Sequence, residues 1–244
     1  MSPRAVVLLS GGLDSATTAA VARRDGFEVH ALSVDYGQRQ RAELVAARRL
    51  ATALGAASHR IVSVDLRSLG GSALTDDAIA VPKDRTDDAI AHGVPSTYVP
   101  ARNTILLGLA TAAAEVAEAD AIYLGINAID FSGYPDCRPE FLEAFRAVAR
   151  AGTRRGSEGH PFDVRAPLLH LRKSDIVRLA VELEVPIAWT LSCYDPPPAP
   201  AVSPSPYGPS AQAPSLHCGR CDACHLRRRG FLEAGLPDPT AYAR

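Results

Sequence analysis

The segment Ser10–Ser15 places hydroxyl, glycine and carboxylate residues in the order Ser-Gly-Gly-Leu-Asp-Ser, between the apolar run Ala5–Leu9 and an alanine-rich helical pattern. The first N–H groups of a helix have no intrahelical partner and lie at the positive end of the helix dipole, so they bind anions. The glycines permit a tight turn and a close approach of backbone to a phosphate. Ser10 and Ser15 add hydroxyl donors, and Asp14 offers a Mg²⁺ ligand or a helix cap. The sequence therefore predicts a strand, a phosphate-binding loop and a helix.

The spacing of this loop excludes two common nucleotide-binding motifs. The lysine of G-x-x-x-x-G-K-[ST] is absent, and so is G-x-G-x-x-G. The loop instead resembles the PP-loop of the N-type ATP pyrophosphatases, which cleave ATP between the α and β phosphates and adenylate a substrate. A capped helix after a buried strand, without a ligand, is the alternative. The resemblance implies an ATP site formed by Leu9, Ser10, Gly11, Gly12, Leu13, Asp14, Ser15, Ala16, Thr17, Thr18, Ala19, Val34 and Asp35.

A second cluster lies near the C-terminus, where the segment Cys218–Cys224 has the pattern C-x-x-C-x-x-C. This spacing supplies three thiolates from one turn, and a tetrahedral zinc ion needs one more ligand. Cys193 is the first candidate for it, with His217 and His225 as competitors. Four thiolates leave no open coordination position, so the zinc would be structural. The predicted ligands are Cys193, Cys218, Cys221 and Cys224.

Composition sets broad limits on function. The 244 residues suffice for one large domain, or one domain with an appendage, and the formal net charge of −1 gives no general attraction to nucleic acid or to an acidic membrane. No apolar run is long enough to span a membrane, and the N-terminus lacks the layout of a secretory signal. We expect a cytoplasmic protein with no membrane partner. Arg220 and Arg227–Arg229 keep a nucleic-acid-binding zinc module as an alternative, although such arginines more often form a solvated helix face.

The remaining segments alternate between strand and helix patterns. Strands are expected over 5–9, 28–34, 59–64 and 121–126, and helices over 41–54 and 103–119. This order predicts an α/β fold with a doubly wound parallel sheet, which binds ligands at the carboxyl ends of its strands. We expect a nucleotide-binding domain over residues 1–180 and a small zinc-binding segment over 181–244, with a proline-rich loop at about 195–215. The polar stretch 76–88 is expected to form a mobile flap or a plain loop.

Five motifs in this order make the whole chain resemble the 7-cyano-7-deazaguanine (preQ0) synthases of queuosine biosynthesis. Besides the two clusters above they are Asp35–Gln38, Pro95–Asn103 and Phe131–Arg138. The resemblance implies conversion of 7-carboxy-7-deazaguanine, ammonia and ATP to a nitrile by a zinc-containing homodimer. Gln40 departs from the family pattern, which has histidine at this position, and the proline-rich insertion is a second departure.

This chemistry assigns roles to particular residues. A carboxylate reacts with ammonia only after its oxygen has become part of a leaving group, and two successive adenylations supply that without an enzyme nucleophile. The resemblance implies catalytic roles for Asp14, Ser15, Arg102 and Lys173. Arg102 is the first choice for the positive charge that a P-loop lysine would supply, with Arg39 and Lys173 next. Cys137 is expected to be a buried loop residue.

The heterocycle presents hydrogen-bond donors that a carboxylate accepts. Asp130 or Asp136 would accept them, Tyr134 would stack on the ring, and Arg138 would orient the substrate carboxylate. In the alternative interpretation, Asp136 and Arg138 only hold their loop in place. A PP-loop paralogue that adenylates another deazapurine or a tRNA base remains an alternative function.

Overall fold

The computed structural model describes residues 2–127, 133–197 and 216–243. Its centre is a five-stranded sheet in the order β3-β2-β1-β4-β5, and every neighbouring pair is parallel. The strands are β1 (Arg4–Leu8), β2 (Glu28–Asp35), β3 (Ser58–Ser63), β4 (Ala121–Tyr123) and β5 (Asp163–Arg165). The chain order reverses between β1 and β4, which is where doubly wound sheets bind ligands.

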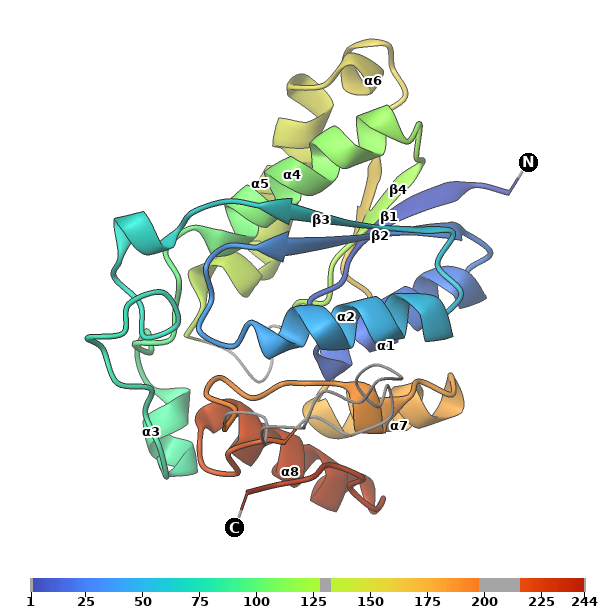
Figure 1. Cartoon of the computed structure of the whole chain (residues 1–244). Helices are drawn as coiled ribbons and strands as arrows, with labels where there is room; N and C mark the ends of the chain where they lie inside the picture. The colour runs from blue at the N-terminus through green and yellow to red at the C-terminus, as the bar shows by residue number, and fades with distance from the viewer. Residues whose placement is uncertain (1, 128–132, 198–215, 244) are drawn as a thin grey trace, which may run out of the picture.

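Helices cover both faces of the sheet (Figure 1). One face packs on α1 (Leu13–Arg24), α2 (Ala42–Ala53) and α7 (Lys173–Glu182), and the other on α4 (Arg102–Val116) and α5 (Pro139–Ala151). Successive side chains of a strand point to opposite faces. In β1, Ala5 and Val7 therefore join the core on the first face, while Val6 joins the core on the second. Because both faces of the strand are buried, residues 5–8 form an uninterrupted apolar run after Arg4.

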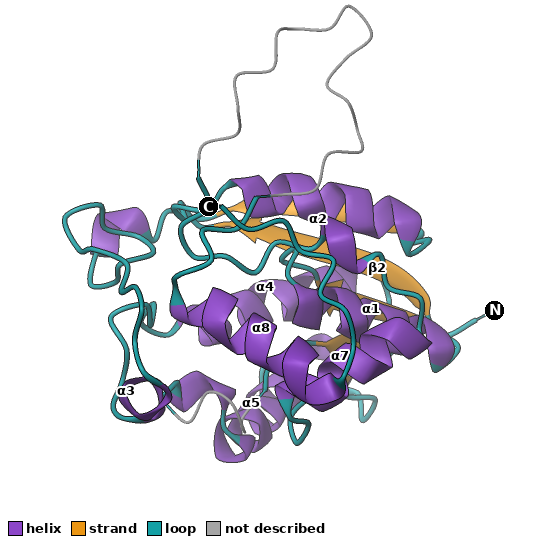
Figure 2. Cartoon of the chain, turned by 90° about the horizontal axis from the view of Figure 1, so that it is seen from below, coloured by secondary structure: helices purple, strands orange, loops and turns teal. Residues whose placement is uncertain are grey.

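The C-terminal part lies against the first layer of helices. Helix α8 (Asp222–Ala234) packs along α7, and Figure 2 shows the two side by side. A third apolar cluster joins the cysteine residues to the end of β2 and to the long segment after β3. The short elements are η1 (Arg67–Leu69), α3 (Asp87–Ala91), η2 (Pro135–Cys137), α6 (Arg154–Ser157) and η3 (Ile187–Trp189).

The prediction of a doubly wound parallel sheet is confirmed, with each expected strand within a few residues of its place. β5 was missed because its three residues, Asp-Val-Arg, carry no apolar pattern. The proposed boundary at residue 180 falls within α7, and the division into two domains stays a prediction. No helix in the described part of the chain is long and apolar enough to cross a membrane.

Candidate active site

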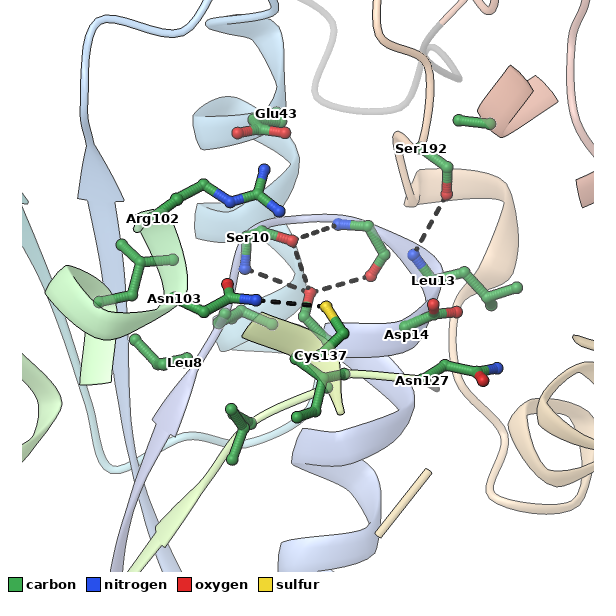
Figure 3. A pocket seen from close by; sticks show the side chains of 18 of the residues that line it. Leu8, Ser10, Leu13, Asp14, Glu43, Arg102, Asn103, Asn127, Cys137 and Ser192 are labelled. Carbon is green, nitrogen blue, oxygen red and sulfur yellow. Dashed lines mark hydrogen bonds between the residues drawn. The ribbon is translucent and has the colours of Figure 1, made fainter. Parts of the chain in front are cut away.

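A cavity of about 250 Å³ opens at the carboxyl ends of β1, β2 and β4. Figure 3 shows the side chains that surround it. Its floor is apolar and includes Leu8, Leu32 and Leu124, while polar and charged groups from α1, α2, α4, α7 and α8 form the walls. Strands and helices distant in sequence therefore contribute to one site.

The predicted phosphate loop forms one side of this cavity. Helix α1 begins at Leu13 after Gly12, which has no side chain to cap the helix, and the Leu13 N–H donates to Ser192 Oγ at 3.5 Å. The Ser15 hydroxyl accepts the Ser10 N–H at 3.2 Å and donates to the Gly12 carbonyl at 3.0 Å, which fixes the turn. Gly11 has φ +97°, and a Cβ there would lie 2.2 Å from the Glu43 carbonyl oxygen. Only glycine fits at position 11. The first turn of α1 borders the cavity, which is large enough for an anion.

Lys173 brings a cation to this loop. It is the first residue of α7, and its Nζ donates to both carboxylate oxygens of Asp14 at 2.8 and 2.7 Å. The lysine is buried, and a Cβ on Gly230 of α8 would lie 2.3 Å from its Cγ, so the close packing of α8 confines it. The structure thus joins two of the predicted catalytic residues, 159 positions apart, in one ion pair.

Arg227 is a second cation beside the loop, and sequence reasoning placed it on a solvated face. This expectation is wrong, because Arg227 is only 2% exposed and lines the cavity. Its guanidinium donates to Thr240 Oγ1 at 2.7 Å, Thr190 Oγ1 at 2.8 Å, Ser192 Oγ at 3.1 Å and the Ile187 carbonyl at 3.2 Å. Burial lowers the pKa of Arg227, and the charges of Asp238 and Asp14 oppose that shift. The available signal was its position three residues after Cys224, on the same face of α8.

Arg102 stands on the opposite wall, at the start of α4. Its Nη1 donates to the Tyr36 hydroxyl at 3.5 Å, and its Cζ lies 6.0 Å from the centre of that ring. Tyr36 is buried, and burial raises its pKa to about 12, so the hydroxyl stays neutral beside the guanidinium. Arg102 therefore supplies a positive charge to the cavity. Among the described residues, no carboxylate forms a hydrogen bond with its guanidinium.

Glu43, in the first turn of α2, is the carboxylate that sequence reasoning missed. It lines the cavity, and its Oε1 accepts from Gln38 Nε2 at 3.0 Å. Burial raises the pKa of Glu43 to about 7, against the opposing effects of Arg102 and of hydrogen bonds from Gln38 and Gln40. The signal available was a glutamate shortly after the Asp35–Gln38 motif, at the start of a helix.

Tyr134, a predicted substrate-binding residue, and Cys137, which was expected to be a buried loop residue, both line the cavity. The Tyr134 hydroxyl lies 2.9 Å from Thr97 Oγ1 and 3.5 Å from the Tyr194 hydroxyl, which fixes the ring in the wall. Cys137 is buried and its Sγ accepts from Asn103 Nδ2 at 3.3 Å. Burial raises the pKa of Cys137 to about 12, so the thiol is a poor nucleophile near neutral pH.

Other predicted site residues do not line the cavity. Asp136 is buried, and its carboxylate accepts the Asn103 N–H at 3.0 Å, which caps the start of α4. Arg39 lies 3.4 Å from Asp77. Asp130 falls outside the described residues. The remaining predicted residues absent from the cavity lining are Gly11, Ala16, Thr17, Thr18, Ala19, Asp35 and Arg138, and the four from α1 are buried in the helix.

The four predicted cysteines meet in one place. One ligand atom from each of Cys193, Cys218, Cys221 and Cys224 lies within 4.8 Å of all the others. The Sγ–Sγ distances of 3.5 Å between Cys221 and Cys224, and of 3.9 Å for two further pairs, resemble the separation of about 3.8 Å that tetrahedral Zn–S bonds of about 2.3 Å require. Hydrogen bonds from Cys193 and Cys224 lower the pKa of Cys221. The hydrogen bond between Cys193 and Cys221 raises the pKa of Cys193. Four thiols this close ionise together only around a cation, so the set can hold a metal ion.

The competing ligands have other partners. His217 is buried, and its Nε2 accepts the Ser192 N–H at 3.1 Å. His225 Nε2 contacts Asp87 at 2.6 Å. The histidine alternatives for the fourth ligand are therefore wrong in this structure, because neither ring belongs to the cluster.

The segment 83–87, which follows β3, contacts the cysteine cluster and helix α8. Lys83 Nζ lies 3.2 Å from Cys218 Sγ and 2.9 Å from Asp195, and Arg85 Nη1 donates to Asp222 at 2.8 Å. Asp84 pairs with Arg220, and Asp87 with Arg229. These contacts assign the polar stretch a structural role, and they engage Arg220 and Arg229, two of the arginines that suggested nucleic-acid binding.

Comparison with known proteins agrees with this geometry. Residues 4–235 match the family model of the queuosine biosynthesis protein QueC. The chain belongs to the QueC family. A 7-cyano-7-deazaguanine synthase of Anaeromyxobacter dehalogenans is 60% identical over 99% of this chain and 96% of its own length. The synthase of Thiobacillus denitrificans is 54% identical over the full length of both. A solved 4-thiouridine synthetase–RNA complex with bound ATP has a remote likeness, at 18% identity and a TM-score of 0.49 over 96% of this chain and 50% of that one.

Membership of the QueC family confirms the resemblance seen in the sequence and the prediction that this chain is an enzyme. The roles of individual residues stay predictions, although the structure now gives their positions. The cavity brings together the phosphate loop, Lys173, Arg102 and Tyr134, and it adds Glu43 and Arg227.

Proposed function

We propose that this QueC family member converts 7-carboxy-7-deazaguanine and ammonia to 7-cyano-7-deazaguanine, with ATP adenylating first the carboxylate and then the amide. The observation that carries the proposal is the glycine-capped start of α1 beside the Lys173–Asp14 pair, at the sheet position where doubly wound folds bind nucleotides. The names of the curated relatives support the choice of product.

ATP occupies the cavity in a defined direction. The β and γ phosphates, which leave as pyrophosphate, bind the loop and the first turn of α1, with Lys173 and Arg227 on one side. Adenine lies beyond the end of β2 near Val34. Mg²⁺ enters with ATP as its counter-ion, and Asp14, whose carboxylate oxygens keep lone pairs beyond the hydrogen bonds from Lys173, is its predicted protein ligand. The α phosphate then faces Arg102, which stabilises the charge that develops there.

The reaction needs no covalent enzyme intermediate. A carboxylate oxygen attacks the α phosphorus and pyrophosphate departs. Ammonia attacks the acyl carbon, and AMP leaves with the C–O electron pair to give the amide. The amide oxygen is then adenylated, and loss of AMP with two protons from nitrogen forms the C≡N bond. Orientation and charge stabilisation are the main requirements, which agrees with a Cys137 thiol held protonated by burial.

The substrate heterocycle binds against the wall that contains Tyr134, with its carboxylate toward Arg102. Asp130 stays the predicted acceptor of the heterocycle's N–H donors. Asp136 is a weaker candidate, since it caps α4 away from the cavity lining.

The cysteine cluster holds one structural zinc ion in this proposal. Its four thiol ligands fill a tetrahedral sphere and leave no position for substrate. The zinc would fix α8, and with it Arg227, relative to the phosphate loop. The homodimer and the cytoplasmic location stay predictions.

The test is to incubate the purified protein with ATP, Mg²⁺, ammonium and 7-carboxy-7-deazaguanine and to follow products by mass spectrometry. We expect the amide and then the nitrile, with two AMP and two pyrophosphate per nitrile. If AMP forms only with another deazapurine or with tRNA, the chain is a paralogue that adenylates that substrate and the proposed substrate is wrong. Zinc binding without any ATP turnover would favour a binding module.

A further inference from the structure

Two polar side chains on the α2 side of the cavity have no role in the mechanism above. Glu43 lines the cavity and keeps acceptor capacity beyond its hydrogen bonds from Gln38 and Gln40. Gln40, which also lines the cavity, is 4% exposed, and within the described parts of the chain its Oε1 has no hydrogen-bond partner. A buried acceptor without a partner is costly, so its presence in a cavity wall indicates a ligand that donates a hydrogen bond.

We propose that Glu43 and Gln40 form the ammonium subsite, with Glu43 as the base that takes the proton from ammonium and Gln40 Oε1 as a second acceptor that orients the nitrogen. This inference rests on the proposed function and adds to it the origin of the nucleophile. Ammonium resembles the lysine side chain, whose pKa is about 10.4, in being protonated at neutral pH and unable to attack carbon. An enzyme that uses it therefore needs a base.

The proton balance of the step is complete. Glu43 accepts one proton from NH₄⁺, the freed nitrogen lone pair forms the C–N bond, and the C–O bond to AMP breaks with its electrons on the phosphate oxygen. The surplus proton of the new C–N group leaves to solvent or to the departing AMP. Between the rounds Glu43 returns its proton to solvent. In the second round Glu43 accepts one of the two protons of the adenylated amide nitrogen, the other leaves to solvent, and AMP departs with the C–O electron pair as the C≡N bond forms.

The surroundings of Glu43 suit this role. Figure 3 shows Glu43 and Arg102 on the side of the cavity away from Asp14, so an acyl adenylate held between Arg102 and the phosphate loop presents its carbon near Glu43. Gln38 Oε1 accepts the Tyr36 N–H at 2.8 Å, which holds the Gln38 side chain in place. Its Nε2 then donates to the Glu43 carboxylate and orients it. The charged and titratable groups around Glu43 are Arg102 from α4 with Asp35 and Tyr36 at the end of β2.

The charge balance also agrees. Burial raises the pKa of Glu43 to about 7, so near neutral pH it is ionised in part and holds a proton in part. A catalytic base works best when its pKa lies near the working pH, because both protonation states are then accessible.

The experiment compares two nucleophiles in Glu43→Gln. Hydroxylamine is mostly unprotonated at neutral pH and forms a hydroxamate from the same acyl adenylate without a base. We expect Glu43→Gln to lose amide formation from ammonium by about 10²-fold or more, while substrate-dependent ATP–pyrophosphate exchange and hydroxamate formation stay within a few-fold of the wild type. Glu182→Gln, on the exposed side of α7, is the control.

Equal losses with ammonium and hydroxylamine, or no loss with ammonium, would overturn the role of Glu43. Absence of substrate-dependent exchange in the wild type would instead reject the proposed function. Gln40→Leu tests the second acceptor, and we expect a higher KM for ammonium with little change for hydroxylamine; an unchanged KM for ammonium removes Gln40 from the subsite.

The wild-type pH profile gives a test that needs no variant. With saturating ammonium, kcat is expected to rise with an apparent pKa of about 7, as Glu43 ionises, and with hydroxylamine this inflection should be absent. The same inflection with both nucleophiles would contradict the proposal.

Discussion

The cysteine cluster and the cavity are the two places where this chain gathers chemically active side chains, and they differ in how charge is balanced. The cluster brings together four like groups, with Sγ atoms at 3.5–3.9 Å for the closest pairs, and only a bound cation lets all of them ionise. The cavity combines groups of opposite sign on each side: Figure 3 shows Glu43 and Arg102 on one side and Asp14 on the other, and Asp14 pairs with Lys173 near Arg227. The first arrangement closes around its four sulfur atoms, whereas the second encloses a cavity between its charges.

Removing a cysteine should break the structural region and, through it, the catalytic one. In Cys224→Ser we expect the zinc content to fall from about one ion per chain to well below half. The melting temperature should drop by more than about 10 °C, since structural zinc contributes about 10–16 kcal/mol in small zinc domains. Elemental analysis and thermal unfolding, with and without a chelator, measure both.

Cys137→Ser is the matched control, because this cysteine lines the cavity outside the cluster. It should retain its zinc. Full zinc content in Cys224→Ser would contradict the four-cysteine site.

Arg227 connects the two regions, so its replacement should weaken ATP binding while the cluster stays loaded. Arg227→Met removes a buried cation near Asp14 and leaves four acceptors on η3, its flanks and the C-terminal segment without their donor. We expect a loss of stability of about 1–3 kcal/mol, and a rise of about tenfold in the KM for ATP, measured by ATP–pyrophosphate exchange.

Arg228→Met is the control from the next position in α8. Arg228 is exposed and lies over the Tyr242 ring, with 3.8 Å from its Cζ to the ring centre. Similar KM values for the two variants would show that Arg227 only supports packing.

The smallest expected effect is the pH dependence of stability from Glu43. Its folded-state pKa of about 7 lies above the ordinary value of 4.5, so burial disfavours the charged form. The resulting destabilisation is absent below pH 4.5, grows between pH 4.5 and about 7, and is complete above that. We expect Glu43→Gln to match the wild type in melting temperature below this window and to exceed it by a few degrees at pH 8. A difference in melting temperature that is constant across pH would show that the ionisation of Glu43 does not cause it.

Much of the fold and part of the site could be predicted from local pattern. The glycine-rich loop, the first four strands and the three thiols of Cys218–Cys224 each depend on residues within a short segment or on one clear spacing. Arg102, Lys173 and Tyr134 were also predicted as site residues, and all three line the cavity. The histidine alternatives and the solvated arginine face failed because burial and hydrogen-bond partners decide them.

The sequence by itself determined that the chain has a glycine-rich loop between a strand and a helix, a parallel α/β order and three thiols in a C-x-x-C-x-x-C pattern, since backbone conformation and residue spacing are local properties. Only the tertiary structure decided that Asp14 pairs with Lys173, that Arg227 is buried beside the loop, and that the pKa of Glu43 rises to about 7. Those properties arise from desolvation and from charges brought close by packing, and both depend on segments that are far apart in the chain.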